Sequence, residues 1–472
     1  MFFKKADNQV LKDRQQLEIV CLDQLVPENH LLRKIENAID FDFIHDLTKN
    51  FYSENNGRPC IDTVILFKII FLNYLYGRNS VRATIEDIKV NVAYRWFLGI
   101  SLGDNVPNYS TFSQNYIRRF KGSDVFKNIF SKVLEKLFDM KLVDASVLFF
   151  DGTHIKANAN KHKIIKKQVK VAADKYQKEL EEEINDFRRK IGKDPFDDEE
   201  EPECINEETG EVTYGKTETR TVSLTDPDCG MFIKGEHERQ LAYVDMCCCD
   251  RNGWHLGFET NPGNMHDSKA FPSFFENVFM KYNPKMGCGD SAFATGRIAK
   301  TFRDHKVDLL VPYVRPKGKR ISFSKRDFTY QSEKDAYLCP NNKFLHPKNI
   351  DRKGFIKYEI SKKECGDCPF KNECLKNAAR KTITRHIYSG HLEATRDLRL
   401  SQRGKEIYAL RKESIERMFG ELKEHHGLRY TRYRGLEKNF NYRCLLYACY
   451  NIKKLALLLD RRKQKGEEKM YA

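Results

Sequence analysis

The sequence lacks an apolar run long enough to cross a bilayer, which argues against an integral membrane protein. Its most apolar stretch, TVILFKIIFLNYLYG, is shorter than a membrane-spanning helix and carries Lys68 in its middle. The first residues, MFFKKADNQVLKDRQQ, contain charges but lack the apolar segment of a secretory signal. No repeat recurs at a fixed period. We therefore expect a soluble, cytoplasmic protein.

Acidic residues are also scarce relative to basic ones. The 472 residues include 83 Lys and Arg against 67 Asp and Glu, which gives a formal net charge of +16 and a pI near 9.1. Such an excess favours a polyanionic partner, although many basic proteins have none. The length allows two or three domains. In a reducing compartment, paired cysteines indicate metal binding before they indicate disulfides.

Residues 1–140 are expected to form a helical N-terminal domain that binds DNA. Their apolar residues recur at helical spacing, and strand-like alternation is missing. Thr111 and Gln114 have the spacing of a capping box, which predicts the start of a helix. This helix would present Arg118 and Arg119 to DNA; the alternative is an ordinary surface helix.

The pattern changes from helix to strand at about Asp144. The segment SVLFFDGTHIKANA reads as a strand, and RQLAYVDMCCCDRNGWHLGFETN as a hairpin that turns at Asn252-Gly253. The later segments MGCGDSAFA and VDLLVPYV are strand-like and alternate with helices, which predicts an α/β fold over residues 141–460. Two insertions and a tail are expected around this core: a charged helical insertion at 161–235, a Cys-rich insertion at 314–405 and a basic tail at 461–472.

Three acidic residues accompany these elements. Asp151 ends the first strand, Asp290 follows the strand-like MGCG, and Glu416 lies on a long amphipathic helix that begins near Gly404. With the motifs GRPCIDTVILFKIIFLNYLYG, DGTHIKANANK, SLTDPDCGMFIKG, NMHDS and RKESIERMFGELKEHHGLRYTRYRGL, the sequence strongly resembles bacterial insertion-sequence transposases of the DDE class. The resemblance covers nearly the whole chain.

The resemblance implies both a fold and a chemistry. The fold is an RNase H-like core in which Asp151, Asp290 and Glu416 are catalytic and hold two divalent cations. Hard oxygen ligands suit Mg²⁺ or Mn²⁺. Two such ions can activate a water or a 3′-hydroxyl and stabilise the leaving oxygen of a phosphodiester. The family also implies transposon ends and target DNA as partners, a homodimer on DNA, and a place at the bacterial nucleoid.

Glu416 competes with three other glutamates on the same helix: Glu413, Glu421 and Glu424. Helical spacing places Glu416 on one stripe with Lys412 and Lys423, and a carboxylate flanked by cations suits a site for metal and phosphate. Three apolar residues would form the buried stripe beside it: Ile415, Phe419 and Leu422.

Basic side chains near the acids are expected to neutralise DNA phosphates. Lys156 follows Asp151 in the sequence, and the run RPKGKRISFSKR at 315–326 contains no acid. Three arginines follow the proposed catalytic helix in GLRYTRYRGL: Arg429, Arg432 and Arg434. His266 is expected to support the site without reacting.

Four cysteines cluster late in the chain with the spacing C-x25-C-x2-C-x5-C: Cys339, Cys365, Cys368 and Cys374. The C-x2-C pair lets two thiolates grip one Zn²⁺, so a structural zinc site is expected. The alternative is a set of reduced thiols in a small subdomain. The run Cys247-Cys248-Cys249 is expected to pack inside a strand.

The leading hypothesis is a DNA transposase that binds the terminal inverted repeats of its element, cleaves at their ends and transfers the strands to a target. An RNase H-like nuclease without strand transfer would use the same metals. A third hypothesis is a DNA-binding protein whose catalysis has decayed, and the intact set of three acids argues against it.

Overall fold

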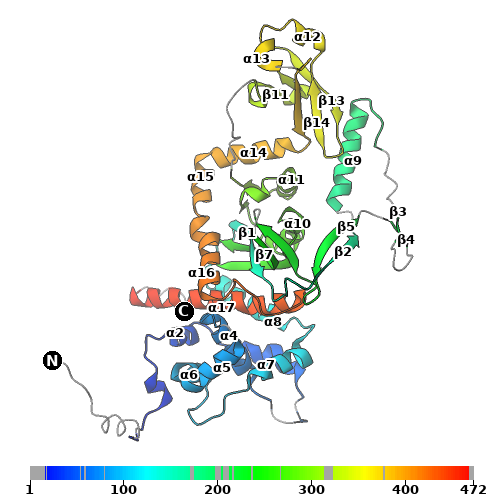
Figure 1. Ribbon diagram of the computed structural model, residues 1–472. Helices are drawn as coiled ribbons and strands as arrows, with labels where there is room; N and C mark the ends of the chain where they lie inside the picture. Colours follow the sequence, from blue (N-terminus) through cyan, green and yellow to red (C-terminus); the bar gives the residue numbers. More distant parts are fainter. Residues whose placement is uncertain are drawn as a thin grey trace, which may run out of the picture. The chain divides into compact units, whose positions relative to one another are not determined.

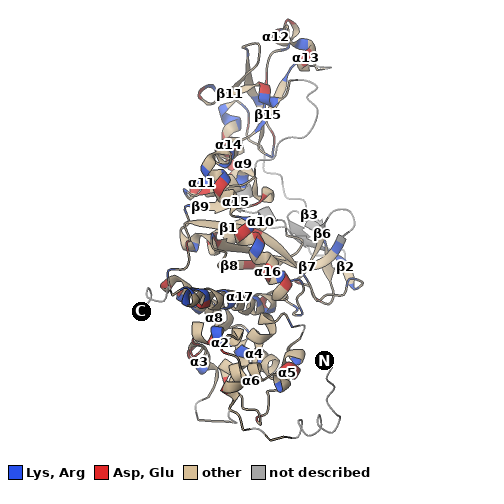
Figure 2. Cartoon of the chain, turned by 90° about the vertical axis from the view of Figure 1, so that its left-hand side faces the viewer, with Lys and Arg blue, Asp and Glu red and all other residues tan. Residues whose placement is uncertain are grey.

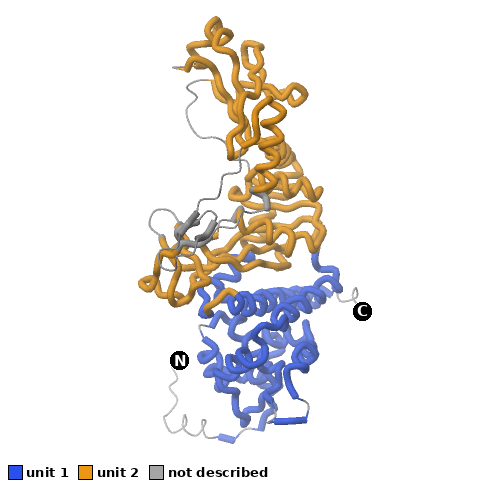
Figure 3. Tube along the Cα trace, turned by 90° about the vertical axis from the view of Figure 1, so that its right-hand side faces the viewer, with its two compact units in different colours: residues 1–143, 418–433, 437–472 blue, residues 144–417, 434–436 orange. Residues whose placement is uncertain are grey.

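The computed structural model divides into two compact units (Figure 3). The first comprises residues 1–143, 418–433 and 437–472, and the second comprises residues 144–417 and 434–436. The structure describes residues 16–466 with gaps at 18, 54, 58–59, 79, 171–174, 197–202, 206–211, 215–216, 235–237, 266, 313–322 and 376–377. The chain therefore passes between the units more than once.

The first unit is helical in the residues that the structure describes, as expected for residues 1–140. Before the chain enters the second unit at residue 144, the helices of the first unit are α2 (Leu31–Ala38), α3 (Phe43–Thr48), α4 (Thr63–Leu75), α5 (Val81–Val90), α6 (Val92–Leu98), α7 (Tyr109–Asn115) and α8 (Val125–Asp139). Shorter turns accompany them: η1 (Leu22–Leu25), η2 (Lys49–Phe51) and the π-helical turn η3 (Tyr116–Phe120).

Helix α4 is apolar on all sides and forms much of the core of the first unit. Nearly all of its side chains are buried, as expected for a helix without a polar face. Its lysine, Lys68, is compensated: the ammonium pairs with Glu36 at 2.8 Å and donates to the Phe97 carbonyl at 3.1 Å. Within the described residues, no helix is both long and apolar enough to span a membrane.

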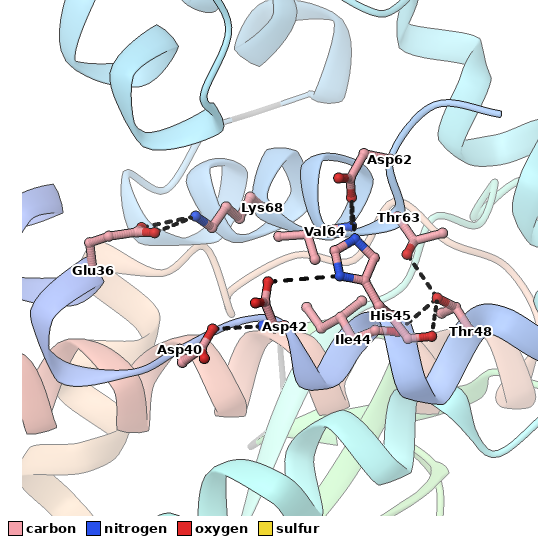
Figure 4. A network of polar contacts seen from close by, with 10 residues as sticks. All are labelled: Glu36, Asp40, Asp42, Ile44, His45, Thr48, Asp62, Thr63, Val64 and Lys68. Carbon is pink, nitrogen blue, oxygen red and sulfur yellow. Dashed lines mark hydrogen bonds and ion pairs between the residues drawn. The ribbon is translucent and has the colours of Figure 1, made fainter. Parts of the chain in front are cut away.

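Polar contacts join the start of α4 to α3 (Figure 4). Asp62 caps α4 by accepting a hydrogen bond from the Val64 amide at 2.7 Å, and it also contacts Nε2 of His45 at 2.9 Å. The hydroxyls of Thr48 and Thr63 lie 2.8 Å apart in the interior. Because the cap satisfies an amide that the helix itself cannot, these contacts fix where α4 begins.

The helix expected to start at Thr111 starts earlier. Asn108 is the N-cap of α7, and its side chain accepts a hydrogen bond from the Ser110 amide at 3.0 Å, so Thr111 lies inside the helix. Asparagine and threonine both cap helices well, and asparagine is the stronger of the two. Arg118 and Arg119 lie in the π-helical turn η3 rather than in a regular α-helix.

The long helix α17 (Leu436–Gln464) belongs to the first unit from Glu437 onward. The ring of Tyr442 packs against Phe112 and Phe126 at centroid distances of 5.9 and 6.0 Å. Near the other end of α17, Asp460 pairs with Lys34 at 2.8 Å. Residues from late in the chain therefore complete the core of the N-terminal helices.

A six-stranded mixed sheet lies at the centre of the second unit (Figure 1). Its order is β10-β9-β1-β7-β6, and β8 also pairs with β7. The strands are β1 (Val147–Lys156), β6 (Gly230–Lys234), β7 (Glu238–Asp250), β8 (His255–Pro262), β9 (Met286–Cys288) and β10 (Asp308–Leu310). β1 runs antiparallel to β7 and parallel to β9, and β9 runs parallel to β10. The expected α/β class is confirmed.

The connections in this sheet follow the sequence pattern closely. The β7–β8 hairpin turns where expected: Gly253 has a φ of +75°, and its amide donates to the Asp250 carbonyl at 3.0 Å. Helices α10 (Asp267–Asn277) and α11 (Gly296–Asp304) precede β9 and β10. The run of cysteines at 247–249 is buried in β7, as expected for packing.

The charged segment after β1 contains a two-stranded ribbon and a helix. In the ribbon, β2 (Ile164–Lys170) pairs antiparallel with β5 (Thr217–Ser223). The charged stretch expected to be helical is α9 (Lys175–Lys190). The short strands β3 (Glu203–Ile205) and β4 (Val212–Tyr214) pair with each other.

The Cys-rich segment contains a second sheet with the order β11-β12-β13-β14-β15. Its strands are β11 (Thr329–Gln331), β12 (Ala336–Leu338), β13 (Phe344–Ile350), β14 (Phe355–Glu359) and β15 (Thr382–His386). Two short helices, α12 (Lys362–Gly366) and α13 (Lys371–Leu375), lie between β14 and β15. Ile184 of α9 is part of the same apolar core, so α9 packs on this sheet (Figure 1).

The prediction of one uninterrupted long helix from about Gly404 is wrong. The structure has α14 (Ser389–Leu400), α15 (Gln402–Ala409), the π-helical turn η8 (Lys412–Glu416) and α16 (Arg417–His425). The Glu416 amide donates to the Arg411 carbonyl at 3.2 Å, and this bond across five residues marks the π turn. The α-helical spacing that placed Lys412 with Glu416 therefore does not apply here, although the expected apolar stripe is buried.

Candidate acidic site

Neighbouring parallel strands position two of the three expected acids. Phe149 of β1 pairs with Cys288 of β9, and Asp151 and Asp290 each follow two residues later. Because parallel strands run in the same direction, both acids come at the same end of this strand pair. Asp290 also caps the turn η5 (Ser291–Phe293), accepting a hydrogen bond from the Ala292 amide at 2.8 Å.

Asp151 does not end its strand, which corrects the expectation from the sequence. β1 continues to Lys156 because β7 pairs along it as far as the pair Lys156 and Ala242. Only the parallel pairing with β9 stops before Asp151. The backbone of Asp151 is therefore paired with β7 on one side. On the other side, the pairing with β9 has already ended at Phe149.

Aromatic rings behind the strands explain the glycines of MGCGD. A Cβ atom on Gly287 would lie 2.5 Å from the Phe302 ring, and one on Gly289 would lie 2.7 Å from the Phe150 ring. Phe150 packs against Phe293 at 4.9 Å between ring centroids. Because side chains alternate along a strand, these rings pack on the face opposite to Asp151.

The turn η8 brings a buried arginine to Asp151. η8 packs against β1 and β7, and Arg411, which immediately precedes it, is only 3% exposed. One terminal nitrogen of Arg411 donates a hydrogen bond to Oδ2 of Asp151, and Nε of Arg411 lies 3.9 Å from Oε1 of Glu416. Arg411 therefore connects Asp151 with Glu416, the third expected acid.

Two further side chains lie near these groups. The guanidinium of Arg399 lies over the ring of Tyr408, 4.2 Å from its centroid. Burial raises the pKa of Tyr408; Arg411 and Arg399 act in the opposite direction, and Asp290 raises this pKa further. Tyr408 is thus within electrostatic range of both Arg411 and Asp290.

The same two arginines also affect the pKa of Cys288, the last residue of β9. Burial raises the pKa of this thiol to about 12, although Arg411 and Arg399 lower it in part. Arg399, Tyr408 and Arg411 were not anticipated from the sequence. The only signal for them was the cationic and aromatic character of the stretch before Glu416.

Three carboxylates supply the kind of donors that Mg²⁺ or Mn²⁺ prefers. Among the described residues, however, no group of three or more His, Cys, Asp or Glu side chains is arranged to hold a metal ion. The guanidinium of Arg411 takes an oxygen of Asp151 instead. The three carboxylates therefore have the donor atoms that a divalent cation needs. In this structure, however, Asp151 is hydrogen-bonded to Arg411 instead.

The residues expected to contact DNA differ in their surroundings. Lys156, Lys412 and Arg118 are exposed. Arg119 is half-buried and donates to Oδ1 of Asn115 at 2.8 Å, and its guanidinium lies 4.6 Å from the ring centroid of Tyr52. The charge of Arg119 is therefore engaged within the first unit.

The later basic residues also have contacts inside their own units. Arg432 donates to the Arg78 carbonyl at 3.1 Å, and Arg434 donates to the Asn158 carbonyl at 2.9 Å. Two more contacts complete this set: Arg429 pairs with Glu424, and the Lys423 ammonium lies 5.9 Å from the Phe419 ring centroid. His266 and most of the basic run at 315–326 lie outside the described residues.

The four clustered cysteines are brought together. They line one small cavity of about 30 Å³ in the second unit: Cys339, Cys365, Cys368 and Cys374. Burial raises the pKa of Cys374, Lys381 lowers it, and the other three thiols raise it further. The Lys343 amide donates to Sγ of Cys339 at 3.4 Å. The thiols converge, but they are not spaced as a closed metal site.

Comparison with known proteins gives two family matches. Residues 20–118 match a transposase domain (DUF772), and residues 338–456 match a transposase DDE domain. The second match contains Glu416 and the four clustered cysteines, whereas Asp151 and Asp290 lie outside both matched segments. No curated protein matches the chain.

Proposed function

Because the chain belongs to the insertion-sequence transposases of the DDE class, we propose that it binds the terminal inverted repeats of its element, cleaves the DNA at their ends and joins them to a target. The observation that supports this proposal is the placement of Asp151 on β1 and of Asp290 two residues beyond the adjacent strand β9, with Glu416 linked to Asp151 through Arg411.

The strand order supports an RNase H-like core. In chain order, β1, β7 and β8 are antiparallel neighbours, and β9 and β10 then add in parallel on the other side of β1. The segments 161–235 and 314–405 are then insertions into this core, except that β6, at the end of the first segment, pairs with β7 in the core sheet.

Asp151, Asp290 and Glu416 would hold Mg²⁺ or Mn²⁺, two ions per site. When bound, the ions would activate a water or a 3′-hydroxyl and neutralise charge on the phosphate. The chain itself contributes rigidity: β7 holds the backbone of Asp151, and the cap of η5 holds Asp290. A fixed geometry of this kind lowers the reorganisation needed during reaction.

DNA binding is assigned to basic residues of both units. In the second unit, Lys156 and Lys412 are exposed and close in sequence to the acids. In the first unit, Arg118 with Arg119 would read the ends, and Lys423, Arg429 and Arg432 would contact phosphates. Arg434, which belongs to the second unit, would contact phosphates as well. Because two ends must be cut together, a homodimer on DNA supplies two matching sites.

The four converging cysteines support a structural zinc site. Thiolates bind Zn²⁺ in tetrahedral geometry, and the C-x2-C pair at Cys365 and Cys368 is suited to it. Deprotonation and small shifts around the cavity would close the thiols on the ion.

The proposed function is tested by replacing each acid with its amide: Asp151→Asn, Asp290→Asn and Glu416→Gln. Each change removes a negative oxygen ligand, so cleavage of end-containing DNA with Mg²⁺ should fall by about 100-fold or more, since the metals supply several kcal/mol of stabilisation. Binding to end DNA should change little. Cleavage is measured by mapping nicks and joined products on labelled DNA, and binding to end DNA is measured by fluorescence anisotropy.

Glu413→Gln is the matched control, because Glu413 is exposed in the same turn and its partner is Arg417 at 3.6 Å. It should cleave at the native rate. Full activity of Glu416→Gln, or an equal loss in Glu413→Gln, would contradict the assignment of Glu416. Nicked DNA without joined products from the native chain would favour the nuclease hypothesis instead. Circular dichroism checks the folding of Asp151→Asn, which also removes the partner of Arg411.

A further inference from the structure

Arg411 occupies an unusual position for a cation. Its side chain is almost completely buried, and a buried charge is costly unless an opposite charge compensates it. The compensation comes from two of the acids that are proposed to bind metal: Asp151, which accepts its hydrogen bond, and Glu416, at 3.9 Å. One cation therefore already offsets about half of the negative charge of these two acids.

The pairing is unequal between the two acids. The distance to Glu416 is too long for a hydrogen bond, and Nε of Arg411 has no hydrogen-bond partner in the described structure. The Glu416 side chain is 54% exposed and can turn, whereas Asp151 is fixed by its strand. Arg411 is thus held firmly at Asp151 and loosely at Glu416.

The π turn explains how Arg411 reaches this place. The hydrogen bond from the Glu416 amide to the Arg411 carbonyl places one additional residue in the turn. In a regular α-helix, residues five apart do not share a face. The wider turn puts both Arg411 and Glu416 within reach of the same site.

We propose that Arg411 is a positioning residue that competes with divalent cations for Asp151. In the absence of metal, the guanidinium neutralises Asp151 and offsets part of the charge of Glu416. A metal ion that binds Oδ2 of Asp151 from the side of Arg411 must displace the guanidinium, because one lone pair of the oxygen cannot serve both cations. Arg411 therefore sets how tightly the site binds metal before DNA is present.

This inference rests on the proposed function, since it assumes that the three acids bind metal. Its test measures metal binding and not DNA cleavage, so the two can fail separately. The variants are Arg411→Gln and Arg411→Lys in the full chain. Arg417→Gln is the matched control, because Arg417 lies on the same stretch, is 71% exposed and pairs with Glu413 instead.

Binding of Mn²⁺ is followed by electron paramagnetic resonance of the free ion. Removing a competing unit charge that is hydrogen-bonded to Asp151 and within about 4 Å of Glu416 should tighten Mn²⁺ binding by at least about tenfold in Arg411→Gln. Arg411→Lys, which is shorter and lacks the planar fork, should bind Mn²⁺ more tightly than the native chain but less tightly than Arg411→Gln. Arg417→Gln should match the native chain. A purely structural role would lower the melting temperature of the variants without tightening their metal binding.

The native chain provides a second measurement that does not depend on the folding of a variant. An arginine-selective dicarbonyl reagent, with mass spectrometry of the peptides, should modify Arg411 faster in saturating Mn²⁺ than in its absence. Unchanged labelling, or unchanged or weaker Mn²⁺ affinity in folded Arg411 variants, overturns the proposal. If the acid-to-amide variants still cleave DNA normally, the proposed function fails instead.

Discussion

The four clustered cysteines show how residues far apart in the sequence come to line the same cavity. Cys339 lies in a turn after β12, whereas Cys365 and Cys374 lie on the short helices α12 and α13. They line one cavity because the second sheet folds these elements onto each other. Burial and the neighbouring thiols raise the pKa of Cys374, so metal binding there must displace protons at neutral pH.

We expect freshly purified protein to contain about one Zn²⁺ per chain. Replacing Cys365 and Cys368 together by serine should release the ion and destabilise the second sheet, whereas Cys21→Ser, at an exposed thiol, should not. Because protons compete with zinc for the thiols, zinc retention should fall as the pH is lowered. Elemental analysis at several pH values measures both effects. Native protein that is free of zinc without exposure to chelators would rule the site out.

The sequence led to the three acids but not to their neighbours. Asp151, Asp290 and Glu416 stand in recognisable motifs, so a resemblance could single them out. Arg411 reaches Asp151 only because of the π turn η8, and the spacing of apolar residues in RKESIERMFGELK does not predict such a turn. The same limit applies to the start of α7, where two residues that cap helices well lie three positions apart and the fold uses the first.

At the scale of elements, the ribbon of β2 and β5 follows directly from the strand that carries Asp151. No acid occurs between residues 152 and 173, and four lysines before and within the first half of β2 are exposed: Lys161, Lys163, Lys166 and Lys167. A two-stranded ribbon fits the major groove of duplex DNA. Figure 2 shows blue segments at β2.

We expect the double change Lys166→Ala and Lys167→Ala to weaken duplex binding about tenfold at moderate salt and to reduce the salt slope by about two, since each lysine would release about one counterion. The matched control is Lys362→Ala with Lys363→Ala, an adjacent exposed pair on α12. Anisotropy titrations over a range of salt concentrations measure the slope. Equal losses in the two double variants would point to a general charge effect and not to the ribbon.

Elements were predicted well where their pattern was long and poorly where it was short. The β7–β8 hairpin and α11 have clear turns and caps, and both were expected. The sheet of the Cys-rich segment was not expected, because two of its strands, β11 and β12, are only three residues long and show no alternation that a sequence pattern could reveal. Glycine occurs at position 287 of β9 and at position 289 just after it because phenylalanine rings fill the space that their side chains would need.

At the scale of the whole molecule, we expect the first unit to carry the preference for end sequences and the second unit to carry the chemistry. Arg118→Ala should reduce the preference for end DNA over scrambled DNA by about 1–3 kcal/mol if Arg118 contacts a base edge. Cleavage of DNA that is already bound should change little. The matched control is Lys136→Ala, an exposed cation on α8. Competition binding with both DNAs gives the preference, and an unchanged preference in Arg118→Ala would contradict this role.

The interleaved course of the chain has a consequence for its biosynthesis. The N-terminal helices meet Tyr442 of α17 only after the ribosome has made the whole second unit. At roughly 5–20 residues per second, this delay is on the order of tens of seconds, and during it the nascent helices expose the rings that α17 later covers. The usual order, in which the N-terminal domain folds first and alone, cannot be completed here. Chaperones that shield apolar surface on nascent chains should therefore affect the yield of this protein more than they affect a chain with two consecutive domains.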